Sequence, residues 1–375
     1  MKFIFCDNTL WGLINFRGEV IQHFVNLGHE VILIAPNDKE EQMKAQVPAH
    51  VRFIPINMER TTLNVLKDLQ YLFTLWRIFR KEKPDYIFTY TIKPNIYGSI
   101  ASRLAFCHST AMLTGLGYIF INDSPVLRLA RRFYKFGLQF ADYLFVLNTY
   151  NKNLVEQKHL FPLEKTILLK GGEGINLQKY GTHSNDAPSI TFLYVGRILW
   201  DKGYDEFSKA ATIIKKQYPD VKFELLGALD KNYPNNVPTE RIQEDEAKGI
   251  LKYLGFTSDM KSVYAQPGLV ITVPSYSEGM NMTLMEACAA GKPIITTNIP
   301  GCKEAVDDGI NGFLIPPKDY LGLAEAMQKY IELNHEQKLK FSDASRLKAQ
   351  ERFDIRFTIQ AYDHIIDKYK SNKNI

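Results

Sequence analysis

The 375-residue chain is poor in the features that mark membrane-spanning, secreted or metal-binding proteins. No apolar run reaches the roughly 18 residues that a membrane-crossing helix needs. The N-terminus, MKFIFCDNTLWG, has neither the long apolar segment nor the small-residue cleavage site of a signal peptide. The chain has four cysteines, and their spacing matches no metal-ligand pattern. These absences favour a reduced, cytoplasmic protein.

Two motifs are also missing, and each absence weighs against a class of enzyme. No G-x-G-x-x-G follows an expected strand and opens a helix, which disfavours a dinucleotide-dependent dehydrogenase. No Asp-x-Asp pair stands at an expected strand end, so we expect a reaction that needs no metal and no other cofactor. The net charge of +5 is too small to indicate nucleic-acid binding, although it suits an anionic ligand or an anionic membrane surface.

What the chain does contain is a regular alternation of apolar strand-like runs and helical patterns. Hydrophobic residues make up 45% of the sequence and charged residues 23%, as in folded globular proteins. The first series of runs is KFIFC, EVILIA, VRFIPI, YIFTY, AMLT and YLFVL. The second is ITFLYVG, KFELLG, LVITVP, PIITT and GFLIPP, with helices expected over 203–217, 258–265, 281–291 and 320–334. Such alternation predicts parallel sheets covered by helices on both faces.

The restart of this pattern predicts two doubly wound α/β domains. A segment rich in Gly, Asn, Ser and Asp lies near 171–189 and is typical of a linker. We therefore expect domains at 1–182 and 183–355, with a last helix at about 356–375 that packs back on the first domain. Ligands of such sheets bind at the carboxyl ends of the strands.

The stretch YSEGMNMTLMEACAAGKPIITT, residues 276–297, carries a glutamate just before an expected helix and another inside it. Ser277 or Asn281 can cap this helix, and Gly279 permits a close backbone approach. Glu278 and Glu286 can accept hydrogen bonds from the hydroxyls of a sugar or a ribose. The alternative is that Glu278 stabilises its own helix dipole and that Glu286 is simply solvated.

A second stretch, FLYVGRILWDKGYDEF, places two cations at the end of an expected strand. Arg197 follows the strand directly, Lys202 stands at the mouth of the next helix, and Gly196 and Gly203 flank them. Two cations at this point suit a diphosphate that gains charge as a glycosyl bond breaks. An ordinary exposed Arg–Lys pair is the alternative.

Together these stretches resemble the retaining glycosyltransferases of family 4, which have the GT-B fold of two Rossmann-like domains facing a central cleft. VGRILWDKG, PSYSEGMNMTLMEACAAGKPIITTNIPGCKEAVDDGINGFLI and KGGEGIN all match, and the resemblance covers essentially the whole chain. WGLINFRGEVIQHFVNLGHEVILIAP and TYTIKPNIYGSIAS are similar to a bacterial subgroup. That subgroup builds capsular, O-antigen or other glycans on a polyprenyl diphosphate.

The resemblance implies a role for each matching residue. Arg197 and Lys202 would hold the donor diphosphate, Glu278 the donor sugar and Glu286 the nucleotide ribose. The remaining donor-side residues are Gly196, Gly255, Phe256, Gly279, Met280, Asn281, Met282 and Thr283, with 254–256 near the base. The acceptor-side residues are Asn15, Phe16 and Gly18, in the loop after the first strand, with Lys93, Asn95, Thr114, Gly115 and Gly117.

The sequence departs from many family members in two places. The loop after the first strand, DNTLWGLINFRG, lacks their pair of adjacent glycines. The segment that often carries a histidine near the reacting sugar reads MLTGLGYIF here, so no catalytic histidine is assigned. The TGLG backbone can let a substrate approach closely, or it can be an ordinary turn.

The expected reaction moves a hexose or N-acetylhexosamine from a sugar nucleotide, usually UDP-linked in this family, to a hydroxyl of a lipid-linked saccharide. The family retains the anomeric configuration, and the absence of a clear nucleophile or general base in the sequence is compatible with a front-face path. Two other functions stay open. One is an epimerase or hydrolase of sugar nucleotides on the same fold, and the other is a non-catalytic nucleotide-binding partner subunit.

The segment RLARRFYKFGLQF predicts an amphipathic helix. Arg128, Arg131, Arg132 and Lys135 recur at spacings of three and four, which places them on one face. The neighbouring face carries Leu129, Phe133, Phe136 and Phe140. This pattern suits a helix on an anionic bilayer, with LFTLWRIFRKEK as a second candidate, although apolar residues at helical spacing more often face a core. Peripheral attachment to the inner face of the cell membrane therefore stays open.

Overall fold

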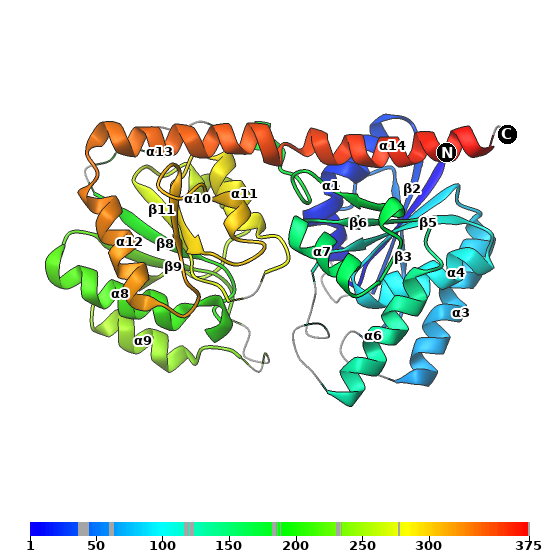
Figure 1. Cartoon of the computed structure of the whole chain (residues 1–375), viewed down its shortest axis with the longest axis horizontal. Coiled ribbons are helices and arrows are strands. Elements are labelled where there is room, and N and C mark those ends of the chain that lie inside the picture. Colours follow the sequence, from blue (N-terminus) through cyan, green and yellow to red (C-terminus); the bar gives the residue numbers. More distant parts are fainter. Residues whose placement is uncertain are drawn as a thin grey trace. The chain divides into compact units, whose positions relative to one another are not determined.

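The computed structural model describes residues 1–36, 45–59, 64–115, 120, 124–181, 185, 187, 189–229, 233, 235–276 and 278–373. It divides into two compact units, and in Figure 1 the first unit contains the blue and cyan elements together with the red helix at the C-terminal end of the chain. The first unit comprises Met1–Glu173 and Ile355–Ile375, and the second comprises Gly174–Asp354. The division thus follows Glu173, whereas the sequence placed it after residue 182, and the last helix groups with the first unit.

The first unit is built on a seven-stranded parallel sheet in the order β3-β2-β1-β4-β5-β6-β7. Its strands are β1 (Lys2–Cys6), β2 (Glu30–Ala35), β3 (Val51–Pro55), β4 (Tyr86–Tyr90), β5 (His108–Leu113), β6 (Tyr143–Val146) and β7 (Thr166–Leu168). Its helices are α1 (Leu10–Asn26), α3 (Val65–Glu82), η1 (Pro94–Gly98), α4 (Ser99–Leu104), α6 (Pro125–Leu138), α7 (Thr149–Gln157), η2 (Leu163–Lys165) and α14 (Ile355–Lys373).

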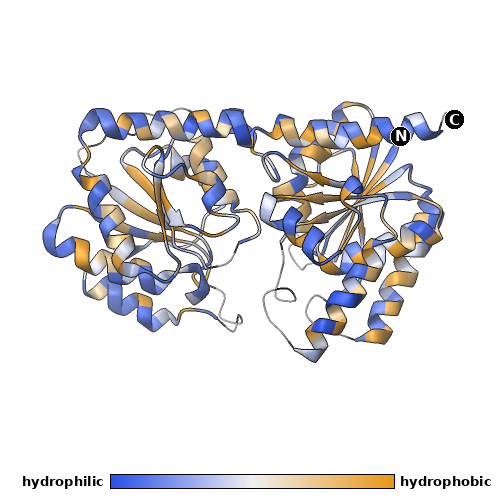
Figure 2. Ribbon diagram, in the orientation of Figure 1, coloured by the Kyte–Doolittle hydropathy of each residue, from blue (hydrophilic) through white to orange (hydrophobic). Residues whose placement is uncertain are grey.

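Alternation of side chains along each strand gives this sheet two buried faces. One face presents aromatic rings, such as Phe5 and Phe88, beside Phe24 of α1 and Tyr362 of α14. The other face packs against α3, α4 and α6. The uniform apolar strands and amphipathic helices are visible in Figure 2. Among the described residues, no helix has the length and hydrophobicity that spanning a bilayer demands.

The second unit repeats the architecture with a six-stranded parallel sheet in the order β10-β9-β8-β11-β12-β13. Its strands are β8 (Thr191–Val195), β9 (Lys222–Leu226), β10 (Lys252–Tyr253), β11 (Leu269–Val273), β12 (Ile294–Thr297) and β13 (Gly312–Ile315). Its helices are η3 (Leu177–Lys179), η4 (Trp200–Lys202), α8 (Tyr204–Gln217), α9 (Thr239–Ala247), α10 (Met260–Tyr264), α11 (Met282–Ala289), η5 (Lys303–Ala305), α12 (Tyr320–Glu332), α13 (His335–Lys348) and η6 (Ala349–Phe353).

Both sheets reverse their strand order at one place, between β1 and β4 in the first unit and between β8 and β11 in the second. Because all strands in each sheet are parallel, their carboxyl ends meet at one edge. The connections leave in opposite directions at the reversal, which opens a crevice for ligands there. The strands predicted at these two points are confirmed, as are the helices predicted over 203–217 and 281–291 beside the second point.

One local prediction is wrong. Asn15, Phe16 and Gly18 were expected in a loop after the first strand, but they lie inside α1, which begins at Leu10. The side chain of Thr9 caps this helix by accepting a hydrogen bond from the backbone N–H of Gly12 at 2.8 Å. Because this cap starts the helix almost directly after β1, only a short connection remains between the strand and the helix.

Gly203 allows the two connections at the β8–β11 crevice to touch. It lies before α8 with φ +82°, and a Cβ at this position would lie 2.2 Å from the carbonyl oxygen of Pro274. Pro274 follows β11 directly. The Lys-Gly sequence therefore reflects a packing constraint as well as the position of the lysine.

We expect Gly203→Ala to lower the free energy of unfolding by more than about 2 kcal/mol, because it adds a backbone clash to the strain of a positive φ. Gly249→Ala is the matched control, since Gly249 has φ +67° with open space around its missing Cβ. The control should lose only about 1 kcal/mol. Chemical denaturation of both variants measures the difference, and equal losses would contradict the close approach.

Candidate active site

Lys202 and Glu278 meet at the carboxyl edge of the second sheet. The Nζ of Lys202, at the end of η4, lies 2.8 Å from Oε1 of Glu278, in the connection after β11. Each side chain is 17% exposed, so the pair is largely shielded from bulk water and yet open to a ligand. The side-chain amide of Asn281 donates to the same carboxylate oxygen at 3.2 Å. The two segments singled out in the sequence thus form one site.

The segment 278–281 is held from two sides. Asn281, one of the two capping residues that the sequence offered, caps α11, because its side-chain oxygen accepts from the backbone N–H of Leu284 at 3.2 Å; the other, Ser277, lies outside the described residues. The backbone N–H of Asn281 donates to the carbonyl oxygen of Gly301 at 2.9 Å. Gly301 has φ +89°, and a Cβ there would lie 2.9 Å from the Cβ of Glu278. The Gly301 turn therefore fixes the backbone that carries Glu278.

Glu286 lies within α11 and faces two tyrosines rather than Lys202. The hydroxyl of Tyr264, on α10, lies 3.4 Å from Oε2 of Glu286 and also donates to the carbonyl oxygen of Thr283. Burial raises the pKa of Glu286, while hydrogen bonds from Tyr180 and Tyr264 act in the opposite direction. A half-buried carboxylate in this setting gains from further hydroxyl donors.

The sequence identified Glu286 and missed Tyr180 and Tyr264. Tyr264 lies in a helix that the sequence predicted, and Tyr180 lies in the expected linker. Nothing in their spacing points to Glu286, because the contacts join segments far apart along the chain.

Arg197 is exposed after β8, and its guanidinium lies 4.9 Å from the ring centroid of Tyr233. The backbone around it is tightly packed, since a Cβ on Gly227 would lie 1.7 Å from the carbonyl oxygen of Gly196. The N–H of Gly227 donates to the carbonyl oxygen of Gly255 at 2.9 Å. The ends of β8, β9 and β10 are therefore tied together at this edge.

The other predicted donor-side residues lie beside this network. Phe256, just beyond β10, is 68% exposed. Gly279 lies between the two acids, in the connection that leads to α11. Met280 and Met282 are half-buried and pack against the core of this face, which leaves part of each side chain at the surface. The individual ligand contacts of these residues remain predictions.

On the acceptor side, the prediction for Asn95 is wrong. Asn95 is fully buried, and its side-chain amide donates to the carbonyl oxygen of Met112 at 2.8 Å and to the hydroxyl of Tyr134 at 3.2 Å. Its side-chain oxygen accepts from Thr89 at 3.0 Å. All of these partners belong to the protein interior, so Asn95 stabilises the fold and cannot reach a substrate.

Lys93 lies in the connection after β4 and forms a 2.7 Å ion pair with Asp68 of α3. The hydroxyl of Tyr97 donates to the other oxygen of Asp68 at 3.0 Å. Thr114 and Gly115 follow β5 at the same edge of the sheet and are half-buried. Gly117, the remaining acceptor-side residue, lies outside the described residues.

The sequence gave no sign of a buried charge network beside these residues. The guanidinium of Arg17, on α1, lies 2.8 Å from Glu173 and 3.8 Å from Asp7, which directly follows β1. It also lies 4.4 Å from the ring centroid of Tyr90 on β4. Burial raises the pKa of Glu173 to about 7, although Arg17 lowers it and Asp7 adds to the rise. The network joins α1, β1 and β4 to Glu173, the last residue of the segment Met1–Glu173 of this unit.

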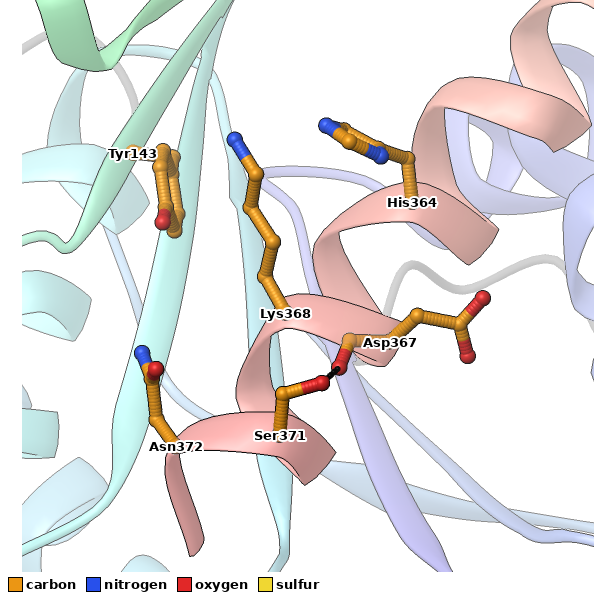
Figure 3. Close-up of a pocket in the computed structure, with 6 residues that line it drawn as sticks. All are labelled: Tyr143, His364, Asp367, Lys368, Ser371 and Asn372. Carbon is orange, nitrogen blue, oxygen red and sulfur yellow. Dashed lines mark hydrogen bonds between the residues drawn. The ribbon is translucent and has the colours of Figure 1, made fainter. Parts of the chain in front are cut away.

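The hollow in Figure 3 belongs to the first unit and lies away from the crevice between β1 and β4. It has a volume of about 400 Å³ and is lined by Tyr143 and by residues of α14 that include Lys368. Tyr143 is the first residue of β6, so the hollow opens at the amino edge of the first sheet. The ammonium of Lys368 lies 5.6 Å from the ring centroid of Tyr143. Within the described part of the chain, no cluster of three or more His, Cys, Asp or Glu could hold a metal ion.

Comparisons with known proteins agree with this geometry. A family model described as Glycosyl transferase 4-like domain matches residues 12–170, and one described as Glycosyl transferases group 1 matches residues 182–348. The structure superposes on that of a glycosyltransferase from Rickettsia africae with a TM-score of 0.81, at 17% identity over 99% of both chains.

Two curated bacterial proteins are similar in sequence. The N,N'-diacetylbacillosaminyl-diphospho-undecaprenol alpha-1,3-N-acetylgalactosaminyltransferase of Campylobacter jejuni is 26% identical, over 99% of this chain and 100% of the relative. The UDP-Gal:alpha-D-GlcNAc-diphosphoundecaprenol alpha-1,3-galactosyltransferase of Escherichia coli is also 26% identical, over 72% of each chain.

The two parallel sheets and the matches over both halves define a glycosyltransferase with the GT-B architecture. The chain belongs to glycosyltransferase family 4, the retaining family that its motifs resemble. The predicted fold and the predicted class of enzyme are confirmed.

The raised pKa of Glu173 predicts a pH dependence of stability. The stability that comes from protonated Glu173 is fully present below the unfolded-state pKa of about 4.3. It is lost as pH rises through the folded-state pKa of about 7. Between pH 5 and pH 8, the free energy of unfolding of the native protein should fall by up to about 3 kcal/mol more than that of Glu173→Gln. Urea denaturation at both pH values measures this. Glu336→Gln, at an exposed site, is the control, and equal slopes in all three proteins would contradict the assignment.

Proposed function

We propose that the protein transfers a hexose or N-acetylhexosamine from a UDP-sugar to a hydroxyl of a polyprenyl-diphosphate-linked saccharide, with retention of the anomeric configuration. The observation that carries this proposal is the shielded Lys202–Glu278 pair at the β8–β11 crevice. The nature of donor and acceptor is supported by the two bacterial relatives, whose names specify undecaprenyl-diphosphate-linked substrates. The name of the Escherichia coli protein also specifies a UDP-linked donor.

The donor fits the site group by group. Lys202 and the exposed guanidinium of Arg197 supply positive charge for the diphosphate. Glu278 then accepts hydrogen bonds from the sugar hydroxyls, and Glu286 accepts them from the ribose in addition to those from its tyrosines. The exposed ring of Phe256, beyond β10, offers an apolar surface for the base.

The chemistry follows from where charge develops. The bond between the anomeric carbon and the diphosphate oxygen breaks, and a bond forms from the acceptor oxygen to the same face of that carbon. The acceptor proton passes to the departing diphosphate. Lys202 and Arg197 stabilise the charge that this leaving group gains, and such stabilisation is a large part of catalysis in preorganised sites. We infer that these cations make a divalent metal unnecessary.

The decisive test is UDP release that depends on an acceptor. Lys202→Met should lower kcat/KM by about 100-fold, because a charge-assisted contact to the leaving group is lost. Lys209→Met removes an exposed lysine of α8 that pairs with Asp205 and should leave the rate unchanged. The assay uses UDP- and GDP-sugars with short-chain prenyl-diphosphate saccharides, with and without EDTA.

Release that needs no acceptor would instead indicate a hydrolase, and the absence of release with every donor would refute the transferase proposal. A melting curve for each variant shows that it is folded. Full activity of Lys202→Met would remove the leaving-group role from this lysine.

A second part of the proposal is peripheral contact with an anionic membrane through α3 and α6. Phe133 and Phe136 of α6 are 43% and 55% exposed, whereas Tyr134 and Leu138 face the core. Of the four apolar residues predicted to share a face, Leu129 is exposed like these two rings, whereas Phe140 is half-buried beyond the end of the helix.

Basic residues accompany these exposed rings. Arg132 and Lys135 of α6 are exposed beside Phe133 and Phe136. On α3, the apolar residues exposed over half or more of their surface are Val65, Leu66, Leu69 and Phe73. Rings flanked by cations suit the interface of an anionic bilayer, where a lipid-linked acceptor resides.

Co-sedimentation with vesicles of phosphatidylglycerol and phosphatidylethanolamine tests this contact. The double variant Phe133→Ser, Phe136→Ser should bind at least about tenfold more weakly, because each ring loses apolar burial. Leu347→Ser on α13 is the control, since Leu347 is 52% exposed in the second unit. Equal binding of all three proteins would exclude contact through α6.

A further inference from the structure

The first unit carries an exposed tryptophan at the place where its sheet should bind a ligand. α1 begins at the carboxyl end of β1, beside the reversal of strand order between β1 and β4. Trp11 lies in the first turn of α1 and is 46% exposed. This position is the ligand-binding edge of a doubly wound sheet. Trp11 was not among the residues that family resemblance singled out.

The local packing fixes the direction of this side chain. Gly12 is buried, and a Cβ there would lie 2.8 Å from Oγ1 of Thr9 and 3.0 Å from Oδ2 of Asp7. The helix can thus approach the end of β1 only with glycine at this position. Leu10, Gly12 and Leu13 are buried on the inward side of the helix, whereas Trp11 is 46% exposed and is therefore directed outward.

A second ring supports the indole. The rings of Trp11 and Phe16 lie 5.1 Å apart between centroids, at an interplanar angle of 89°. Phe16 in turn lies 5.2 Å from the buried guanidinium of Arg17. The edge-to-face contact holds the indole without covering it, as nearly half of its surface stays open.

The surroundings of the two rings are polar. Asn15 is exposed, and its side-chain amide donates to the carbonyl oxygen of Trp11 at 3.0 Å. Asn8 and Thr9 precede the helix and are half-exposed. An aromatic surface bordered by amides and a hydroxyl matches a pyranose ring, which has apolar C–H faces and hydroxyls around its rim. An alkyl chain would instead require a continuous apolar surface.

We propose that Trp11 and Phe16 form an aromatic platform on which a sugar ring of the acceptor stacks, while Asn15 forms hydrogen bonds with its hydroxyls. This inference rests on the proposed transferase function and specifies which surface of the first unit recognises the saccharide. The platform binds the acceptor and takes no part in bond breaking. It therefore acts on the KM for the acceptor and leaves kcat and the KM for the donor unchanged.

The steady-state test uses the acceptor identified by the UDP-release assay. Trp11→Ala should raise the acceptor KM by roughly tenfold, as expected for the loss of one aromatic stacking contact, with donor KM and kcat within about twofold of the native values. Trp11→Phe should recover most of the loss. Phe106→Ala is the control, because Phe106 is 86% exposed just before β5, at the amino edge of the same sheet.

A fluorescence titration provides a readout that does not require an altered Trp11. The chain has three tryptophans, so replacing Trp76 and Trp200 by phenylalanine leaves Trp11 as the only indole. Saturating acceptor should shift its emission and protect it from iodide quenching.

An unchanged acceptor KM in Trp11→Ala, or emission that the acceptor leaves unaffected, would overturn the platform while acceptor-dependent UDP release still supports the transferase. An equal rise in donor KM would also overturn it. Absence of UDP release with every acceptor would refute the proposed function itself, and the platform with it.

Discussion

The ion pair between Lys202 and Glu278 is the constraint on which the second unit depends. The two residues belong to connections that leave adjacent parallel strands, so they can meet only where the strand order reverses. Their contact requires the backbones of these connections to touch, which Gly203 permits at Pro274, while Gly301, after β12, lets a third connection pack against Glu278. Gly203 and Gly301 of the family motifs are thus explained by approach distances of the backbone, and the charged residues are explained by the chemistry that this approach creates.

The two glutamates of the stretch 276–297 have opposite electrostatic environments. Glu278 is paired with Lys202, and the positive charge of the lysine compensates the negative charge of the carboxylate. A carboxylate can therefore lie near a diphosphate site without leaving an unpaired negative charge there. Burial raises the pKa of Glu286 despite the nearby charge of Lys179, so this carboxylate gains stability from hydroxyl donors such as Tyr264. A sugar nucleotide has hydroxyls at both ends and a diphosphate between them. A paired carboxylate just before α11 and a half-buried one within it correspond to that arrangement.

Much of the fold and of this site could be predicted because the relevant information is local in sequence. Short, nearly continuous apolar runs that alternate with helical patterns indicate parallel strands, and the strand ends specify where Arg197, Lys202 and Glu278 emerge. The cap at Asn281 follows from its position before an apolar helical run. Predictions failed where a single short signal shifted an element. The cap at Thr9 converted an expected loop into the first turns of α1 and changed the setting of the acceptor-side residues.

The remaining features could not be predicted because they depend on contacts between distant segments. Asn95 looks like a polar residue at a strand end, yet the interior satisfies its amide completely. The pair between Arg17 and Glu173 joins residues from opposite ends of the first long segment of its unit. The proposed functions of the two units suggest why one was easier to interpret. A donor has constant chemistry that demands the same charges at the same spacing. Acceptor saccharides vary in shape, and surface residues such as Trp11 that would recognise them follow no fixed spacing. Their role emerges only when packing, as at Gly12, shows which way they must point.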